Sequence, residues 1–170
     1  MTETFQPFDY QIPMVEWGLH RDRFAYLASP GMGKTVVTLK VLSEWISSGR
    51  SRGVLIVCPI RVGLVTWPDQ VARWEHSAWM RVANLRTPQG LRAWDEGSAD
   101  IYLLNPEMIP KLADRLFKDR TIPADTLVID EISTAKNPGS KRYKALRKYI
   151  HLFPRRIGLT GTPVPNTYLD

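Results

Sequence analysis

Cysteine is nearly absent from this 170-residue chain, and long apolar runs are missing altogether. The single cysteine, Cys58, has no partner for a disulfide within the chain, and we expect it to be a buried strand residue. No apolar run approaches the roughly 20 residues of a membrane span, and the first residues lack the pattern of a signal peptide. These absences predict a cytoplasmic protein with no membrane partner. The histidines show no metal-ligand spacing with one another or with Cys58, which argues against a zinc site: His20, His76 and His151.

The length and composition of the chain predict one compact domain over residues 1–170. Hydrophobic residues make up 44% of the sequence, enough for one good core, and we find no repeat or interdomain linker. Short apolar runs alternate with longer amphipathic stretches, which predicts an α/β fold with a mostly parallel central sheet flanked by helices. We expect strands over residues 24–28, 54–58, 81–86, 100–104, 126–130 and 156–160, and helices over residues 33–48, 61–75, 88–95, 106–118 and 139–151.

Three prolines mark helix boundaries. Thr87-Pro88 and Asn105-Pro106 each place a capping residue before a proline at the first helical position. Pro68 lies inside the second expected helix, so we expect that helix to break there.

The segment from Ala28 to Thr35 has the pattern of a phosphate-binding loop. It fits G-x-x-x-x-G-K-[ST] at every defined position except the first, where alanine replaces glycine. The segment joins a short apolar run to a stretch with helical spacing, so backbone N–H groups at a helix N-terminus would face an anion. Lys34 would reach the β- and γ-phosphates of a nucleotide, and the Thr35 hydroxyl would ligate Mg²⁺. The loop residues that would surround the phosphates are Ser29, Pro30, Gly31, Met32 and Gly33.

Two adjacent carboxylates, Asp130 and Glu131, close a later apolar run. Asp130 would hold the metal ion directly or through water, and Glu131 would orient or deprotonate the attacking water. A glycine-rich turn followed by Lys-Thr is also compatible with an ordinary helix start. The paired carboxylates favour a site for ATP and Mg²⁺, in which Lys34, Asp130 and Glu131 are the catalytic residues.

Polar or proline-containing segments follow four of the expected strands, and in open α/β sheets ligands collect at this edge. The segments begin near Cys58, Leu104, Asp130 and Leu159. Each alone is a weak signal, because strands also end in such residues to form turns. Their order along one chain is much more specific.

That order resembles the first RecA-like motor domain of superfamily 2 helicases, and most closely the Swi/Snf-type double-stranded DNA translocases and their phage and bacterial relatives. The resemblance covers nearly the whole chain and rests on Tyr10-Gln11, Ala28 to Thr35, Val54 to Pro59 with Trp67 and Trp74, Leu104 to Glu107, Asp130-Glu131, Ala135 to Arg142 and Leu159 to Asn166. It implies a RecA-like P-loop NTPase fold in which Gln11 reads the adenine. Its last segment implies that Thr160, Gly161 and Thr162 couple ATP to movement. The family usually has histidine where this chain has Ser133, which leaves the coupling of that loop open.

The distribution of charge predicts contact with DNA. The formal net charge is +6 and the pI is about 9.6, and residues 132–169 contain eight Lys or Arg but no Asp or Glu. Within the helix expected over 139–151, Tyr143, Leu146 and Ile150 would face the core and leave the basic side chains exposed. Phosphate contacts of this kind give affinity without sequence readout, although an ordinary solvated helix surface is the alternative. The candidate nucleic-acid residues are Arg61, Asn105, Lys136, Lys141, Arg142 and Lys144.

The sequence ends at Asp170, before the second RecA-like domain and its arginine finger that the resemblance implies. Such an arginine accelerates phosphoryl transfer by roughly 10³ to 10⁵. We therefore expect a lobe that binds ATP but hydrolyses it poorly until a second domain joins it, in cis or in trans. One alternative is a non-enzymatic, nucleotide-responsive DNA-binding or regulatory module that pairs with another protein. A small-molecule phosphotransferase is a weaker alternative, because no lid or acceptor-binding cluster is evident.

Overall fold

A parallel sheet organises the part of the chain that the computed structural model describes, which is residues 2–118, 121–131 and 139–161. The sheet has six strands in the order β1-β6-β5-β2-β4-β3, and every neighbouring pair is parallel. The α/β prediction is confirmed, with a sheet that is parallel throughout. All the expected strands form, although the stretch expected over 81–86 contributes only three residues. The strands are β1 (Arg23–Leu27), β2 (Val54–Val57), β3 (Val82–Asn84), β4 (Ile101–Leu104), β5 (Thr126–Asp130) and β6 (Arg155–Thr160).

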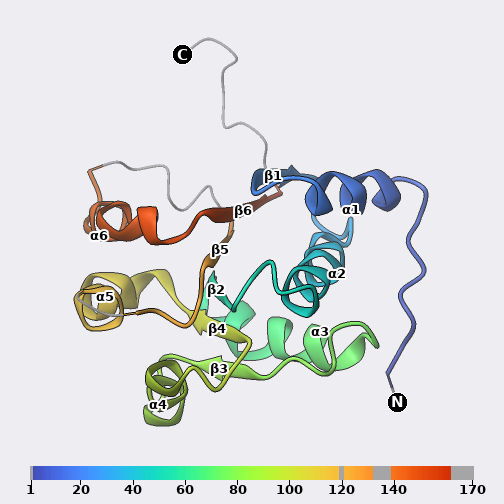
Figure 1. Cartoon of the computed structure of the whole chain (residues 1–170). Helices are drawn as coiled ribbons and strands as arrows, with labels where there is room; N and C mark the ends of the chain where they lie inside the picture. Colours follow the sequence, from blue (N-terminus) through green and yellow to red (C-terminus); the bar gives the residue numbers. More distant parts are fainter. Residues whose placement is uncertain (1, 119–120, 132–138, 162–170) are drawn as a thin grey trace.

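Helices cover both faces of the sheet (Figure 1). In this view α1, α2 and α3 lie on one side of the strands, and α4, α5 and α6 lie on the other. The α-helices among the described residues are α1 (Gln11–Leu19), α2 (Lys34–Ser47), α3 (Trp67–Arg73), α4 (Pro88–Glu96), α5 (Ile109–Phe117) and α6 (Lys141–Tyr149). Shorter turns are the π-helical η1 (Val62–Thr66) and the 3₁₀ turns η2 (Pro106–Met108) and η4 (Ile150–Leu152).

The strands supply alternate side chains to two hydrophobic cores. In β2, Val54 and Ile56 pack with residues of α2 and α3, whereas Leu55 and Val57 pack with residues of α4, α5 and α6. All four residues of this strand are buried, as a central parallel strand covered on both faces requires. Cys58 is 1% exposed, which confirms that it is buried, although β2 ends at Val57 and Cys58 lies just outside the strand.

One of the three proline predictions is confirmed. The stretch expected as one helix over 61–75 changes from the π-helical η1 to α3 just before Pro68, but Thr66 and Trp67 keep helical backbone angles, so the helix does not break there. The Thr87 hydroxyl accepts a hydrogen bond from the Gly90 N–H at 3.0 Å, which caps α4. Asn105 was wrongly expected to cap an α-helix over 106–118. Its side chain instead donates to Glu107, and the segment begins with the 3₁₀ turn η2 before α5.

Two further features differ from the sequence-based expectations. Helix α1 was not predicted, and it packs against α2. In α6 the buried side chains are Leu146 and Tyr149, whereas Tyr143 and Ile150 are only half-buried. Tyr149 reaches across to α5, where its hydroxyl donates to Asp114 at 2.5 Å. Within the described ranges, every helix is too short or too polar to cross a lipid bilayer.

Candidate nucleotide site and the adjacent edge of the sheet

Three neighbouring strands bring the candidate nucleotide residues to one edge of the sheet. Because all strands are parallel, their carboxyl ends meet at this edge, where α/β sheets bind ligands. Strand β6 lies between β1 and β5. The phosphate loop after β1, the carboxylates at the end of β5 and the segment after β6 are therefore neighbours.

The phosphate loop has the backbone conformation that its glycines allow. Gly31 and Gly33 have φ angles of 84° and 71°, a left-handed region that favours glycine, and α2 begins directly after Gly33. The Lys34 ammonium donates to the Ala28 carbonyl at 2.6 Å and to the Ser29 carbonyl at 3.1 Å. The carbonyl groups at the start of the loop thus surround the Lys34 ammonium group, next to the first turn of α2.

Gln11, the residue that the resemblance implies reads the adenine, lies against this loop. Its side chain is 3% exposed, and its Nε2 donates to the Met32 carbonyl at 3.3 Å. Its Oε1 accepts from the Phe8 N–H at 3.1 Å, which fixes the orientation of the amide. A Cβ atom on Gly33 would displace the Gln11 amide from its present position, and the positive φ angle of Gly33 favours glycine independently.

Asp130 is a carboxylate at the end of a buried strand. Its Oδ2 accepts from Trp67 Nε1 at 3.0 Å. Burial raises the pKa of Asp130, and the charge of Glu131 acts in the same direction, while the Trp67 hydrogen bond and the Lys34 charge oppose the rise. A cation beside this carboxylate would offset the cost of keeping it charged.

The oxygen donors at this site suit Mg²⁺. Thr35, at the start of α2, has a hydroxyl oxygen, and Asp130, at the end of β5, has carboxylate oxygens; both are hard ligands of the kind that Mg²⁺ prefers. Among the described residues no cluster of three or more histidine, cysteine or carboxylate side chains is arranged to hold a metal ion. Mg²⁺ needs no such cluster, because it is commonly bound by one or two carboxylates together with substrate phosphates.

Glu131 is held in an unusual conformation that aims it at β6. Its φ angle is +65°, and a non-glycine residue in this region carries strain of about 1–3 kcal/mol. The Thr160 hydroxyl donates to Glu131 Oε1 at 3.0 Å, and Thr160 is 5% exposed. The last residues of β6 are thereby joined to the candidate water-activating carboxylate.

The end of β6 and the residue after it also touch the phosphate loop. The Ala28 N–H donates to the Thr160 carbonyl at 3.3 Å. A Cβ atom on Gly161 would lie 3.1 Å from Pro30 Cγ, so the two segments are closely packed. Thr160 and Gly161 thus contact both halves of the candidate site. Thr162 and Ser133 lie outside the described residues.

The candidate nucleic-acid residues occupy the other half of the same edge. Arg61 is exposed in the segment after β2, and Lys141, Arg142 and Lys144 are exposed at the start of α6. Asn105, after β4, is 5% exposed, and its Nδ2 donates to Glu107 Oε2 at 2.9 Å. Lys136 lies outside the described residues.

The acid-free segment of the sequence is not free of opposing charge in the fold. Carboxylates from earlier elements pair with three of its basic side chains: Glu107 with Arg142 at 3.2 Å, Asp114 with Lys148 at 3.1 Å and Asp125 with Arg155 at 2.8 Å. Lys141 and Lys144 are exposed and form no ion pair with any described residue. The basic surface is therefore narrower than the sequence suggests.

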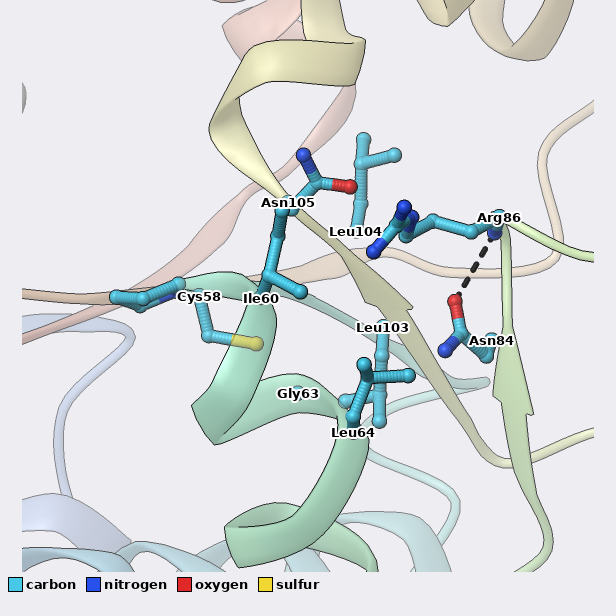
Figure 2. A pocket seen from close by; sticks show the side chains of 10 residues that line it. Cys58, Ile60, Gly63, Leu64, Asn84, Arg86, Leu103, Leu104 and Asn105 are labelled. Carbon is cyan, nitrogen blue, oxygen red and sulfur yellow. Dashed lines mark hydrogen bonds between the residues drawn. The ribbon is translucent and has the colours of Figure 1, made fainter.

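The sequence analysis missed the positions of two side chains at this edge. Trp67 was named only as part of the resemblance, and nothing local in the sequence shows that it donates to Asp130, which lies 63 positions away. Arg86 was placed inside an expected strand, but β3 ends at Asn84, whose Oδ1 accepts from the Arg86 N–H at 3.0 Å. Figure 2 shows Arg86 extending over a pocket that Leu64 and Asn105 also line. The asparagine at position 84, a residue type common in turns, was the sequence signal that could have ended the expected strand before Arg86.

Comparison with known proteins gives a consistent result. Residues 10–170 match the family model described as an SNF2-related domain. Protein p41 of Acyrthosiphon pisum secondary endosymbiont phage 1 is 32% identical, over 99% of this chain and 38% of its own length. The Saccharomyces cerevisiae transcription regulatory protein SNF2 is 29% identical, over 93% of this chain and 10% of its own length. The chain thus spans well under half the length of these two relatives.

A solved structure shares the fold described above. The Sulfolobus solfataricus SWI2/SNF2 ATPase core in complex with dsDNA has a TM-score of 0.77 and 25% identity, covering 94% of this chain and 32% of that one. The UvsW helicase of bacteriophage T4 has a TM-score of 0.71 at 14% identity, covering 92% of this chain and 53% of that one, which shows a common fold.

Proposed function

Because the chain belongs to the SNF2-related family, we propose that it is the ATP- and Mg²⁺-binding N-terminal lobe of a Swi/Snf-like DNA translocase. One observation carries the nucleotide part of the proposal. The phosphate loop, the Asp130-Glu131 pair and Thr160 come from three adjacent strands, and Thr160 is hydrogen-bonded both to Ala28 of the loop and to Glu131 at the ligand-binding edge of the sheet.

The residues divide the work of binding and hydrolysis. Lys34 would turn from the Ala28 and Ser29 carbonyls to the β- and γ-phosphates, while the N–H groups at the start of α2 face the same anion. Thr35 and Asp130 would hold Mg²⁺, whose charge neutralises the phosphates and fixes their orientation. Glu131, positioned by Thr160, would orient the attacking water and accept its proton.

The other half of the edge would contact DNA. Lys141 and Lys144 present exposed ammonium groups, which suit backbone phosphates and carry no sequence information. The Sulfolobus relative was solved with dsDNA, which supports a duplex as the ligand. A second RecA-like domain that closes over the nucleotide would complete the translocase, because translocation requires two lobes that move relative to each other.

Replacement of Lys34 tests the nucleotide site. Lys34→Ala should weaken binding of ATP with Mg²⁺ by about tenfold to a hundredfold in calorimetry, because a charge-assisted contact to the phosphates is lost. Lys40→Ala is the matched control, since Lys40 lies in the same helix and its ammonium group pairs with Glu44 at 2.7 Å. Thermal unfolding of both variants monitors the fold. Equal ATP affinity in Lys34→Ala and the wild type would contradict this assignment.

A further inference from the structure

Glu107 stands between the buried edge of the sheet and the basic helix α6. Its Oε2 accepts from Asn105 Nδ2 at 2.9 Å, and its Oε1 lies 3.2 Å from the Arg142 guanidinium. Asn105 is 5% exposed, whereas the side chains of Glu107 and Arg142 are 50% and 48% exposed. The buried Asn105 side chain therefore holds the Glu107 carboxylate in place. The carboxylate itself is exposed at the surface where we propose that DNA binds.

Both partners of this ion pair sit on ordered elements. Glu107 lies in η2, directly after β4. Arg142 lies in the first turn of α6, which the Ser140 hydroxyl caps by accepting from the Tyr143 N–H at 3.2 Å. Ion pairs between flexible surface side chains contribute little, in part because ordering them costs entropy. That cost is reduced here, since the Glu107 carboxylate is already fixed by Asn105.

The surroundings of Glu107 keep it ionised. The hydrogen bond from Asn105 lowers its pKa, and the positive charges of Arg142 and Arg86 act in the same direction. Figure 2 shows the Arg86 side chain extending toward the Asn105 amide from the neighbouring strand end. The Glu107 carboxylate thus lies among guanidinium groups, as a bound phosphate would. A phosphate of the DNA backbone would therefore compete with Glu107 for the same guanidinium groups.

We propose that Glu107 is a built-in competitor of the DNA backbone, which withholds Arg142 from phosphate and so limits the affinity of this lobe for DNA. The inference rests on the proposed DNA contact and adds a residue that weakens it. A translocase must release each phosphate that it grips, so a fixed carboxylate among the contacting cations favours release.

The test compares charge-neutralised variants of the purified chain on a short duplex of arbitrary sequence, with fluorescence anisotropy over a salt series. Glu107→Gln removes the charge, and its amide oxygen can still accept from Asn105. Glu96→Gln is the matched control, because Glu96 is an exposed residue at the end of α4 and the net charge changes equally. The double variant Glu107→Gln/Arg142→Gln removes both partners. Thermal unfolding confirms that each variant folds.

Glu107→Gln should bind duplex DNA roughly three- to tenfold more tightly than Glu96→Gln at low salt. Its plot of log affinity against log salt should steepen by about 0.9, because one more phosphate is neutralised. The double variant should return to the affinity and slope of the wild type. A gain that persists in the double variant would overturn the inference, because it would not act through Arg142.

The outcomes also separate this inference from the proposed function. If the wild type binds with a steep salt dependence but Glu107→Gln matches Glu96→Gln, only the role of Glu107 is overturned. If the wild type does not bind and Glu107→Gln does, the masking role is supported. If neither binds at low salt, the DNA contact and the role of Glu107 both fail.

Discussion

Asp130 and Glu131 are adjacent in the sequence but are held in different ways. Asp130 ends a regular strand, is partly buried, and is bonded by the indole of Trp67. Glu131 leaves the strand with a left-handed backbone and is bonded by Thr160. A raised pKa on one carboxylate and backbone strain on the other both cost stability. Such costs concentrate where a protein prepares a site for a ligand.

The pKa shift of Asp130 predicts how the stability of the ligand-free protein depends on pH. Because burial raises this pKa in the folded state, the contribution of Asp130 to stability is greatest below its unfolded pKa of 3.8 and is lost as pH rises through the folded pKa. Asp130→Asn should therefore be more stable than the wild type at pH 7, since its amide can still accept from Trp67. The difference should shrink near pH 3, where both side chains are neutral.

Denaturant unfolding at the two pH values, without nucleotide or divalent cation, measures this effect. Asp9→Asn serves as the control, because Asp9 is exposed. An Asp130→Asn variant that is less stable than the wild type at pH 7 would contradict this prediction. It would show that the surrounding residues already stabilise the charged carboxylate, without a cation.

At the residue scale, the sequence predicts those features that depend only on residues adjacent in the chain. Gly31, Gly33 and Lys34 follow one another in a pattern whose backbone requirements are local, and the structure has the expected left-handed glycines. The partnership of Glu107 with Arg142 joins residues that meet only after the sheet and α6 have packed. No spacing rule along the chain reveals such a pair.

At the scale of elements, helix α1 and the π-helical conformation of η1 were not predicted, and both depend on packing. Helix α1 contains Pro13 and has no side-chain cap. Its Met14 carbonyl accepts from the Tyr26 hydroxyl at 2.6 Å, and a Cβ atom on Gly18 would lie 2.8 Å from Val41 Cγ2. The π-helical turn η1 is likewise seated by close contact, because a Cβ atom on Gly63 would lie 2.9 Å from Cys58 Sγ. Both elements are fixed by the tertiary fold, which periodicity does not report.

The element α6 offers a direct test of the DNA surface. Lys141→Glu/Lys144→Glu should weaken duplex binding by at least about tenfold at low salt and flatten the slope of log affinity against log salt by about 1.8, because two phosphate contacts are lost. ATP affinity should not change, because the phosphate loop is a separate group of residues. Arg92→Glu/Lys118→Glu, on the exposed surfaces of α4 and the end of α5, makes the same charge change away from this edge. Equal losses of duplex affinity in the two double variants would show that the effect depends on net charge and not on the position of the lysines.

At the scale of the whole molecule, one edge of the sheet carries both proposed activities. The phosphate loop, the two carboxylates and Thr160 lie at the ends of β1, β5 and β6, and the candidate DNA residues that the structure describes follow β2 and β4 or begin α6. The two halves adjoin where β5 pairs with β2. A second lobe that closes over this edge would contact nucleotide and DNA together, which is the arrangement that coupling requires.

The last prediction concerns turnover and follows from the charges at the nucleotide site. Lys34 is the basic side chain whose charge acts on Asp130, and phosphoryl transfer develops further negative charge that one lysine compensates poorly. The 170-residue chain should therefore show little DNA-stimulated ATP hydrolysis in a phosphate-release assay. Adding the C-terminal motor domain of a similar SNF2-related protein, fused or in trans, should raise the rate by a factor on the order of 10³ if it supplies an arginine finger. Glu131→Gln should abolish the stimulated rate while ATP binding is retained, because water activation is lost and the phosphate contacts remain. Brisk DNA-stimulated turnover by the chain alone, abolished by Glu131→Gln, would show that this lobe contains all the charge that the reaction needs.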